Sequence, residues 1–214
     1  MRVTLKLATS LDGRIATASG ESRWITGEAA RRAVHALRAD HDAVLIGVET
    51  ALADDPELTV RSANFTGRQP ARVVLDSRQR LSPDCKLART ARETPTYVVS
   101  ILLNSNDRLT DAGVKVLTVK AVGERPDLKA SLEALEAEGI GSVLVEGGGQ
   151  VAASFIRCEL VDQIEWFRAP IVLGGEGRPA IGSLALTELA KAPRFKRVAL
   201  EAVGDDLWER YERA

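Results

Sequence analysis

The chain has 214 residues, of which 45% are hydrophobic and 28% are charged, and its formal net charge at pH 7 is −1. This is the composition of an ordinary globular protein, long enough for one sizeable core. The balance of 29 basic and 30 acidic residues excludes a general electrostatic attraction to nucleic acid or to a membrane surface, so we expect neither as a partner.

In chain order, the first half of the sequence predicts one helix and five strands. A strand at residues 3–10 is followed by a polar loop at 11–24 and by a helix that begins near Gly27, with Thr26 as its cap. Short, continuous apolar runs then predict buried strands at 42–48, 71–77, 96–103 and 114–119.

The second half predicts an amphipathic helix at 127–139 that Gly139 ends, and then a strand, a glycine turn and a helix over 141–157. A long strand at 161–175 and a hairpin at 194–213, turning at "GDD", complete the chain. Buried strands that alternate with helices indicate an α/β fold, with a mostly parallel central sheet flanked by helices. The last strands lack a helix between them, so we expect an antiparallel C-terminal hairpin at the edge.

Cysteine and histidine usage narrows the possible sites. Cys85 and Cys158 form no CxxC pair, and His35 and His41 are the only histidines, so we expect no metal site. No apolar run approaches the roughly 20 residues that span a bilayer, and the N-terminal residues lack the apolar core of a signal peptide. A reducing cytoplasm is the expected location.

The stretch "SVLVEGGGQVAASFI", residues 142–156, places three glycines between a strand and a helix. Such a junction lets backbone N–H groups face an anion, although a tight turn that packs helix against strand is the simpler alternative. The run is neither GxGxxG nor a Walker A loop. Glu146 ends an otherwise apolar strand, where a buried acid would need partners, so it is a candidate functional residue.

Three other segments contain residues that are unusual for their place. Lys6 interrupts an apolar strand, although most strand lysines are simply exposed. Trp24 lies in the loop before the first helix, where packing is its ordinary role. The "DDP" at 54–56 is a turn signal, and no second acidic cluster lies nearby to complete a Mg²⁺ site.

Taken together, four segments resemble one family. "KLATSLDGRIATASGESRWITG", "GVETALADDPELTVR", "RVVLDS" and "LVEGGGQVAASFI" resemble the reductase domain of the bifunctional riboflavin-biosynthesis deaminase–reductase, in order and spacing, over most of the chain. The resemblance implies a dihydrofolate-reductase-like fold, NADPH as cofactor, and reduction of the ribose of 5-amino-6-(5-phosphoribosylamino)uracil to a ribityl chain. The zinc-ligand motifs of the deaminase are absent, so we expect a single reductase domain at 1–214.

The resemblance also implies roles for individual residues. Lys6 and Glu146 match polar residues that face the substrate, and we expect them to be catalytic because the carboxyl ends of parallel strands lie side by side. The implied substrate contacts are Ser22, Arg38, Leu58 and Arg61. The implied cofactor contacts are Ala8, Trp24, Thr50, Asp54, Ser77, Gly148, Gly149, Gln150 and Val151.

Two further expectations come from the residues themselves. Ser77 and Arg78 follow a strand and could bind the adenosine 2′-phosphate that distinguishes NADPH from NADH, whereas Asp76 is expected to be a turn or cap acid. Relatives form homodimers, and the apolar residues of 161–175 predict a C₂ dimer through the late strands. The apolar residues on which this prediction depends are Ile164, Trp166, Ile171 and Val172.

Alternative functions stay open at this point. The substrate could be the undeaminated 2,5-diamino-pyrimidinone that related archaeal and fungal reductases use, or the chain could be another pteridine or pyrimidine reductase on the same fold. A nucleotide-binding module without catalysis is a third alternative, against which the presence of both Lys6 and Glu146 argues.

Overall fold

The computed structural model describes residues 1–62, 65–104 and 106–214, which form two compact units. The first unit comprises residues 1–2 and 35–144, and the second comprises 3–34 and 145–214. Helix α1 (Glu28–Ala39) crosses the boundary between them, so its first turns belong to the second unit and its last turn to the first.

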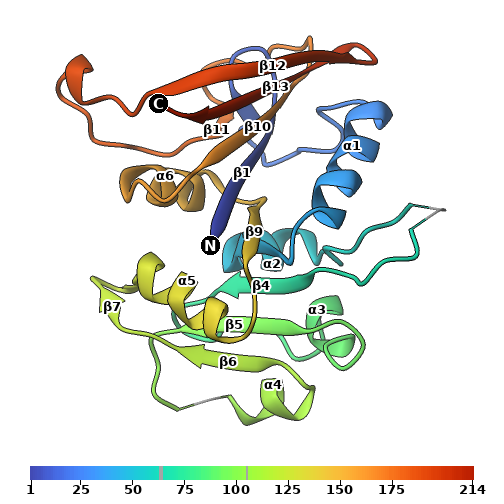
Figure 1. Ribbon diagram of the computed structural model, residues 1–214, viewed down its shortest axis with the longest axis vertical. Helices are drawn as coiled ribbons and strands as arrows, with labels where there is room; N and C mark the ends of the chain where they lie inside the picture. The colour runs from blue at the N-terminus through green and yellow to red at the C-terminus, as the bar shows by residue number, and fades with distance from the viewer. Residues whose placement is uncertain (63–64, 105) are drawn as a thin grey trace. The chain divides into compact units, whose positions relative to one another are not determined.

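Parallel strands form the sheet of the first unit (Figure 1). Strands β3 (Ala43–Gly47), β4 (Ala71–Leu75), β5 (Thr96–Ser100) and β6 (Lys115–Thr118) follow one another, and β9 (Ser142–Val145) lies beside β3. Their register places Ile46, Val74, Val98 and Val116 in one row across the sheet. Branched apolar residues in continuous runs suit strands that are buried on both faces.

Short helices connect these strands. They are α2 (Val48–Asp54), α3 (Lys86–Arg89), α4 (Asp107–Asp111) and α5 (Leu128–Ala137), and a small hairpin joins β7 (Ala121–Val122) to β8 (Arg125–Pro126). Asp127 caps α5 by accepting a hydrogen bond from the amide of Ala130 at 2.9 Å, and Gly139 follows the helix at a φ of +84°. These caps explain why the predicted helix at 127–139 forms nearly where the sequence indicates.

A fully buried arginine, Arg72 on β4, ties this unit together. Its guanidinium donates to the hydroxyls of Thr90 and Thr96 and to the carbonyl oxygens of Leu87 and Thr94, at 2.7–3.1 Å. Burial lowers the pKa of the Arg72 guanidinium to about 10, so it stays protonated at neutral pH. The charge is therefore solvated by neutral oxygens from α3, from the start of β5 and from the segment that joins them.

The main sheet of the second unit combines parallel and antiparallel strand pairs. Strand β1 (Arg2–Thr9) pairs in parallel with β10 (Gln163–Arg168), which pairs antiparallel with β13 (Asp206–Arg213), and β13 pairs antiparallel with β12 (Phe195–Val203). Helix α6 (Gly149–Arg157), a 3₁₀ turn at Leu189–Lys191 and a small pair of β2 (Arg14–Ala16) with β11 (Arg178–Pro179) complete it. The predicted α/β class, mostly parallel strand pairing and antiparallel C-terminal hairpin are confirmed.

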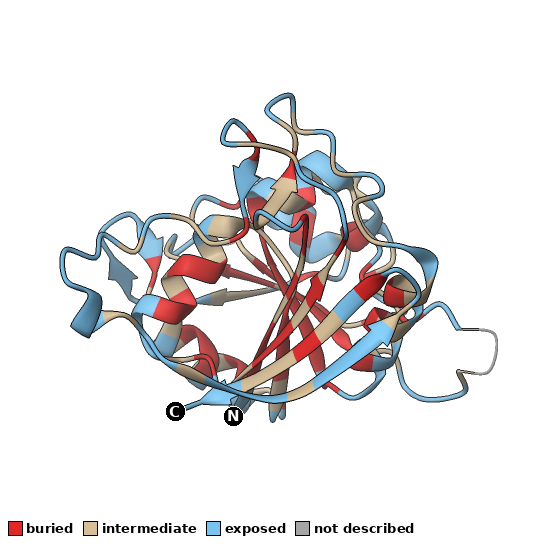
Figure 2. Ribbon diagram, turned by 90° about the horizontal axis from the view of Figure 1, so that it is seen from above, coloured by how far each residue is buried: buried red, intermediate tan, exposed pale blue. Residues whose placement is uncertain are grey.

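Buried residues follow the strands of both units, whereas much of β12 is exposed (Figure 2). Within the parts that the structure describes, no helix is long and apolar enough to cross a membrane. The same residues hold no cluster of three or more histidine, cysteine or acidic side chains that could bind a metal ion.

Four sequence-based predictions need correction. The long strand predicted at 161–175 ends at Arg168, because Pro170 lacks the amide that would continue the ladder. Ile164 is buried in the core rather than presented to a partner. Several short elements lie in segments for which no regular structure was predicted: α2, α3, α4, β2, β7, β8 and β11.

The start of α1 is the fourth correction. The helix begins at Glu28, so Gly27 rather than Thr26 holds the cap position, and the amide of Gly27 donates to Asp206 Oδ2 at 2.7 Å. The first residue of β13 therefore supplies a carboxylate that accepts a hydrogen bond from an amide at the N-terminus of α1, where a negative charge is favourable.

Candidate active site

The glycine turn before α6 uses two of its glycines for different reasons. Gly148 stands at the cap position with a φ of +80°, a conformation that side chains rarely adopt. Gly149 lies so close to another segment that an added Cβ would be 2.5 Å from the carbonyl oxygen of Pro179. The Gly149 carbonyl also accepts a hydrogen bond from the amide of Gly182 at 2.8 Å. Close backbone packing against 179–182 therefore requires glycine here.

The same turn leaves a helix N-terminus without a side-chain cap. The first N–H groups of an α-helix have no acceptor within the helix, and the helix dipole favours an anion beside them. Gln150 is exposed and Val151 is half-buried in this first turn. The arrangement suits a phosphate group, and that Gly148, Gly149, Gln150 and Val151 contact a cofactor stays a prediction.

Lys6 and Glu146 both belong to the second unit, and both are half-buried. Lys6 lies in the middle of β1, and Ala8 projects to the same face because side chains alternate along a strand. Glu146 directly follows β9, as the apolar run before it predicts. That the two side chains converge on one ligand stays a prediction.

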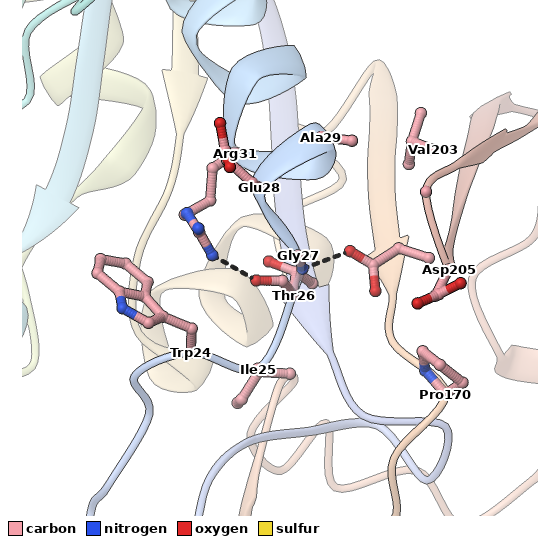
Figure 3. A pocket seen from close by; sticks show the side chains of 12 residues that line it. Trp24, Ile25, Thr26, Gly27, Glu28, Ala29, Arg31, Pro170, Val203 and Asp205 are labelled. Carbon is pink, nitrogen blue, oxygen red and sulfur yellow. Dashed lines mark hydrogen bonds between the residues drawn. The ribbon is translucent and has the colours of Figure 1, made fainter.

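The loop before α1 forms one side of a pocket of about 420 Å³ (Figure 3). Trp24 is 68% exposed, and the guanidinium of Arg31 lies 4.5 Å from the centre of its ring. Arg31 also donates to the carbonyl oxygen of Thr26 at 2.8 Å, which holds the arginine in place. The turn between β12 and β13, with Asp205 and Asp206, forms the other side. The Trp24 ring is thus exposed at the pocket and does not have the packing role that is ordinary for a loop tryptophan. Ser22 lies two residues before it.

In the first unit, Arg38, Leu58 and Arg61 lie in one small region. The guanidinium of Arg38 donates to the carbonyl oxygen of Thr59 at 2.9 Å, and the amide of Arg61 donates to Nδ1 of His35 at 3.1 Å. The last turns of α1 therefore hold the segment that carries both other residues. His35, which sequence reasoning missed, lies three positions before Arg38 on the same helix, and this spacing was the available signal.

Leu58 has a buried side chain in the core of the first unit and a left-handed φ of 56°. A contact with a ligand at this residue would therefore come from its backbone groups. Thr50 is half-buried in α2, and Asp54 is the exposed last residue of that helix. Asp55 ends α2 in the left-handed conformation and accepts a hydrogen bond from the amide of Lys86 at 2.8 Å. The "DDP" sequence thus acts as a turn.

The segment after β4 contains Ser77 and Arg78. Asp76 is buried, and its Oδ2 accepts a hydrogen bond from the amide of Leu81 at 2.8 Å, so it is the turn acid that the sequence predicts. Arg78 is exposed and pairs with Glu124 of the β7–β8 hairpin at 3.3 Å. Arg80 pairs with Glu49 at the start of α2. Sequence reasoning missed both acids, because they lie 46 and 31 positions away from their partners.

The loop after β1 is fixed by Asp12. Its carboxylate accepts hydrogen bonds from the Ser10 hydroxyl at 2.6 Å and from the amides of Leu173 and Gly174 at 3.1 and 2.8 Å. The Ser10 hydrogen bond is the main reason why the pKa of Asp12 falls to about 2. This acid connects the "SLDGRIA" segment to the residues after β10.

The sequence and the fold are similar to those of known proteins. Residues 1–208 match the family model described as the RibD C-terminal domain. The chain is 37% identical over 208 residues to the riboflavin biosynthesis protein RibD of Actinobacillus pleuropneumoniae. The matched region covers 96% of this chain and 55% of that protein. The structure of RibD from Acinetobacter baumannii has a TM-score of 0.86 at 33% identity, covering all of this chain and 58% of the other.

A second group of relatives has a different printed name. The 2,5-diamino-6-ribosylamino-4(3H)-pyrimidinone 5′-phosphate reductase of Methanothermobacter thermautotrophicus is 36% identical over 211 residues, covering 98% of this chain and 96% of that protein. The chain thus spans about half the length of the RibD proteins that it matches, but nearly the whole length of this archaeal relative.

Proposed function

Because the chain belongs to the RibD C-terminal domain family, we propose that it is an NADPH-dependent reductase of riboflavin biosynthesis. Its reaction is the reduction of the ribose of 5-amino-6-(5-phosphoribosylamino)uracil to the ribitylamino product. The observation that carries the proposal is the match over residues 1–208, together with the uncapped α6 N-terminus within that range. We propose that residues 1–214 form one reductase domain, and two free cysteines agree with a cytoplasmic location.

The undeaminated pyrimidinone is a second candidate substrate, since the archaeal relative is named for it and is matched over nearly its whole length. The test is to incubate the purified chain with NADPH and one candidate substrate at a time: the deaminated pyrimidine, the undeaminated pyrimidinone, or dihydrofolate. We expect oxidation of NADPH with a phosphoribosylamino-pyrimidine and a product two hydrogens heavier by mass spectrometry. Turnover of dihydrofolate alone, or binding of NADPH without turnover of any of them, would contradict the proposal.

The residues present fit a dinucleotide. The α6 N-terminus offers N–H groups to a pyrophosphate, the missing Cβ of Gly149 allows close backbone packing, and Trp24 presents an aromatic face. NADPH, when bound, supplies the hydride. The residues proposed to hold it are Ala8, Trp24, Thr50, Asp54, Ser77, Arg78, Gly148, Gly149, Gln150 and Val151.

The substrate requires different chemistry. Arg38 and Arg61 offer guanidinium groups for its phosphate, with Ser22 and the backbone at Leu58 as further contacts. A cyclic ribosylamine must open to an imine before its anomeric carbon can be reduced, and proton transfers accompany both steps. We assign Lys6 to the hydroxyls of the opened sugar, and Glu146 to accepting hydrogen bonds or relaying a proton. Alignment of the reacting groups is the remaining contribution of the protein.

Replacement of Arg78 with glutamate is expected to lower the preference for NADPH over NADH roughly tenfold to a hundredfold. A charge-assisted contact to the 2′-phosphate is worth about 1.5–3 kcal/mol, which corresponds to that range. The measurement is the ratio of kcat/KM for the two cofactors. Arg80→Glu is the matched control, because Arg80 lies two positions after Arg78 on the same segment and likewise pairs with a glutamate, Glu49. Ser77→Glu tests the serine separately. An unchanged ratio in Arg78→Glu would remove this arginine from the cofactor site.

We also propose a C₂ homodimer through the late strands. Trp166 is half-buried and Ile164 is buried, so the apolar residues that this region exposes include Ile171, Val172, Val198, Leu200 and Leu207. Leu200→Glu is expected to convert a dimer into a monomer in light scattering at micromolar concentration. Val122→Glu is the matched control, because Val122 is 65% exposed in the first unit whereas Leu200 is 51% exposed in β12. A monomeric wild-type protein would refute the dimer.

A further inference from the structure

A row of charged residues crosses three strands of the second unit. Lys6 on β1 is in register with Glu165 on β10, and Glu165 is in register with Arg210 on β13. Residues in register on neighbouring strands project to the same face of a sheet and lie about 5 Å apart at their Cβ atoms. The middle strand of the three therefore carries an acid in register with a lysine on one side and an arginine on the other, next to the proposed catalytic lysine.

Glu165 is only 1% exposed, yet its carboxylate is well provided with donors. Oε1 accepts hydrogen bonds from Gln163 Nε2 at 2.6 Å and from Arg210 Nε at 2.7 Å, and Oε2 accepts one from Trp208 Nε1. The Trp208 ring stacks on Phe167, with 5.1 Å between ring centres. The position of this negative charge is thus set by side chains from two strands.

This arrangement is more elaborate than sheet stability requires. A buried carboxylate is costly unless it is paired, and apolar residues of similar volume would stabilise the sheet as well or better. A glutamate kept in such a place, with an arginine and a tryptophan as its partners, therefore points to a use for its carboxylate. Lys6 is the residue in register with Glu165 for which such a charge would matter. Without Glu165, Lys6 and Arg210 would be two cations on the same face of the sheet.

We propose that Glu165 is a positioning residue that acts through Lys6, an inference that rests on the proposed reductase function. Its fixed carboxylate offsets the repulsion between Lys6 and Arg210 and holds the ammonium in the orientation that the substrate requires. Gln163, Trp208 and Arg210 keep the carboxylate in place. No sequence feature indicated this role, because Glu165 lies in a segment whose pattern is that of an ordinary strand.

The chain contains a matched control on the opposite face of the same sheet. Glu209 is 4% exposed, and its carboxylate pairs with Arg168 at 2.7 Å and accepts a hydrogen bond from the Tyr211 hydroxyl at 3.0 Å. It directly precedes Arg210, so it projects to the other face. Glu209 thus matches Glu165 in burial and in its arginine partner, but not in its relation to Lys6.

The test is a double-mutant cycle on kcat with Lys6→Met, Glu165→Gln and Glu209→Gln. We expect Glu165→Gln to lower kcat about tenfold with an unchanged KM for NADPH, and to have no further effect when Lys6 is already methionine. Glu209→Gln should change kcat less than twofold in either background. Glu165→Asp should recover part of the loss, since it restores the charge.

Two outcomes would overturn the proposal while leaving the reductase function intact: normal kcat in Glu165→Gln, or an equal loss from it with and without Lys6. Absence of turnover in the wild-type protein would overturn both. Should Glu165→Gln fail to fold, Trp208→Phe removes one donor and keeps the stacked ring. We expect Trp208→Phe to lower kcat severalfold when Lys6 is present and to have no effect in the Lys6→Met background. An equal loss of kcat in both backgrounds would refute the positioning role of Glu165.

Discussion

Replacement of Lys6 with methionine, or of Glu146 with glutamine, is expected to lower kcat by roughly 10²–10⁴-fold in a protein that still folds and binds NADPH. General acid–base assistance is typically worth that much, and a group that acts mainly in the transition state lowers turnover more than binding. Both replacements keep most of the side-chain volume, and both positions are half-buried, so stability should change little. Steady-state kinetics with a phosphoribosylamino-pyrimidine, together with a cofactor titration, gives both quantities.

Lys115 provides a control for the loss of a strand lysine. It lies at the start of β6, where it pairs with Glu138 at 2.6 Å, and it has no proposed role in the reaction. Lys115→Met should therefore keep turnover within a factor of about two. Near-normal kcat in Lys6→Met or in Glu146→Gln would remove that residue from the mechanism.

A single methyl group added at Gly149 is expected to weaken cofactor binding about tenfold or more and to destabilise the fold by ~1–3 kcal/mol. Its Cβ would lie 2.5 Å from the Pro179 carbonyl oxygen and 3.4 Å from the Ala180 oxygen and the Gly182 nitrogen. All three are backbone atoms, so relief requires the 179–182 segment or the start of α6 to move. Alanine gains up to ~1 kcal/mol over glycine within a helix, which is too little to offset this overlap.

Gly175→Ala is the matched control for this substitution. An added Cβ there meets nothing within 4 Å, and the backbone lies outside the left-handed region. Urea unfolding and NADPH titration of both variants separate the effect of the contact from that of losing a glycine. A Gly149→Ala protein with wild-type stability and affinity would show that the turn has no need of the missing side chain.

Hydrophobic periodicity was enough to predict most of the fold. The runs that became β3, β4 and β5 are mostly apolar, with Arg72 on β4 and Thr96 and Ser100 on β5 as buried polar exceptions. Such runs are typical of parallel strands that are buried on both faces. The hairpin at 194–213 was likewise readable, because two apolar-containing segments flank a "GDD" turn. Periodicity failed at α2 and β2, which are short and depend on packing more than on their own pattern.

Candidate site residues were predictable where local chemistry is unusual, and not where a partner is distant in sequence. The three glycines and Glu146 are adjacent, and Lys6 is a charge in an apolar run, so each was visible alone. By contrast, the pairing of Arg78 with Glu124 and the donors around Glu165 depend on which strands become neighbours. The capping of Gly27 by Asp206 joins residues that are 179 positions apart, which no local pattern can indicate.

The discontinuous second unit has a consequence for the order of synthesis. Residues 35–144 of the first unit are contiguous and leave the ribosome together, whereas β1 and the start of α1 must wait for β10, β13 and Asp206. Closing a flexible loop of that length costs roughly 4 kcal/mol of chain entropy, and prior collapse of residues 35–144 would shorten the effective loop. The earliest-made strand is thus among the last to find its neighbour, and its apolar face needs protection during translation.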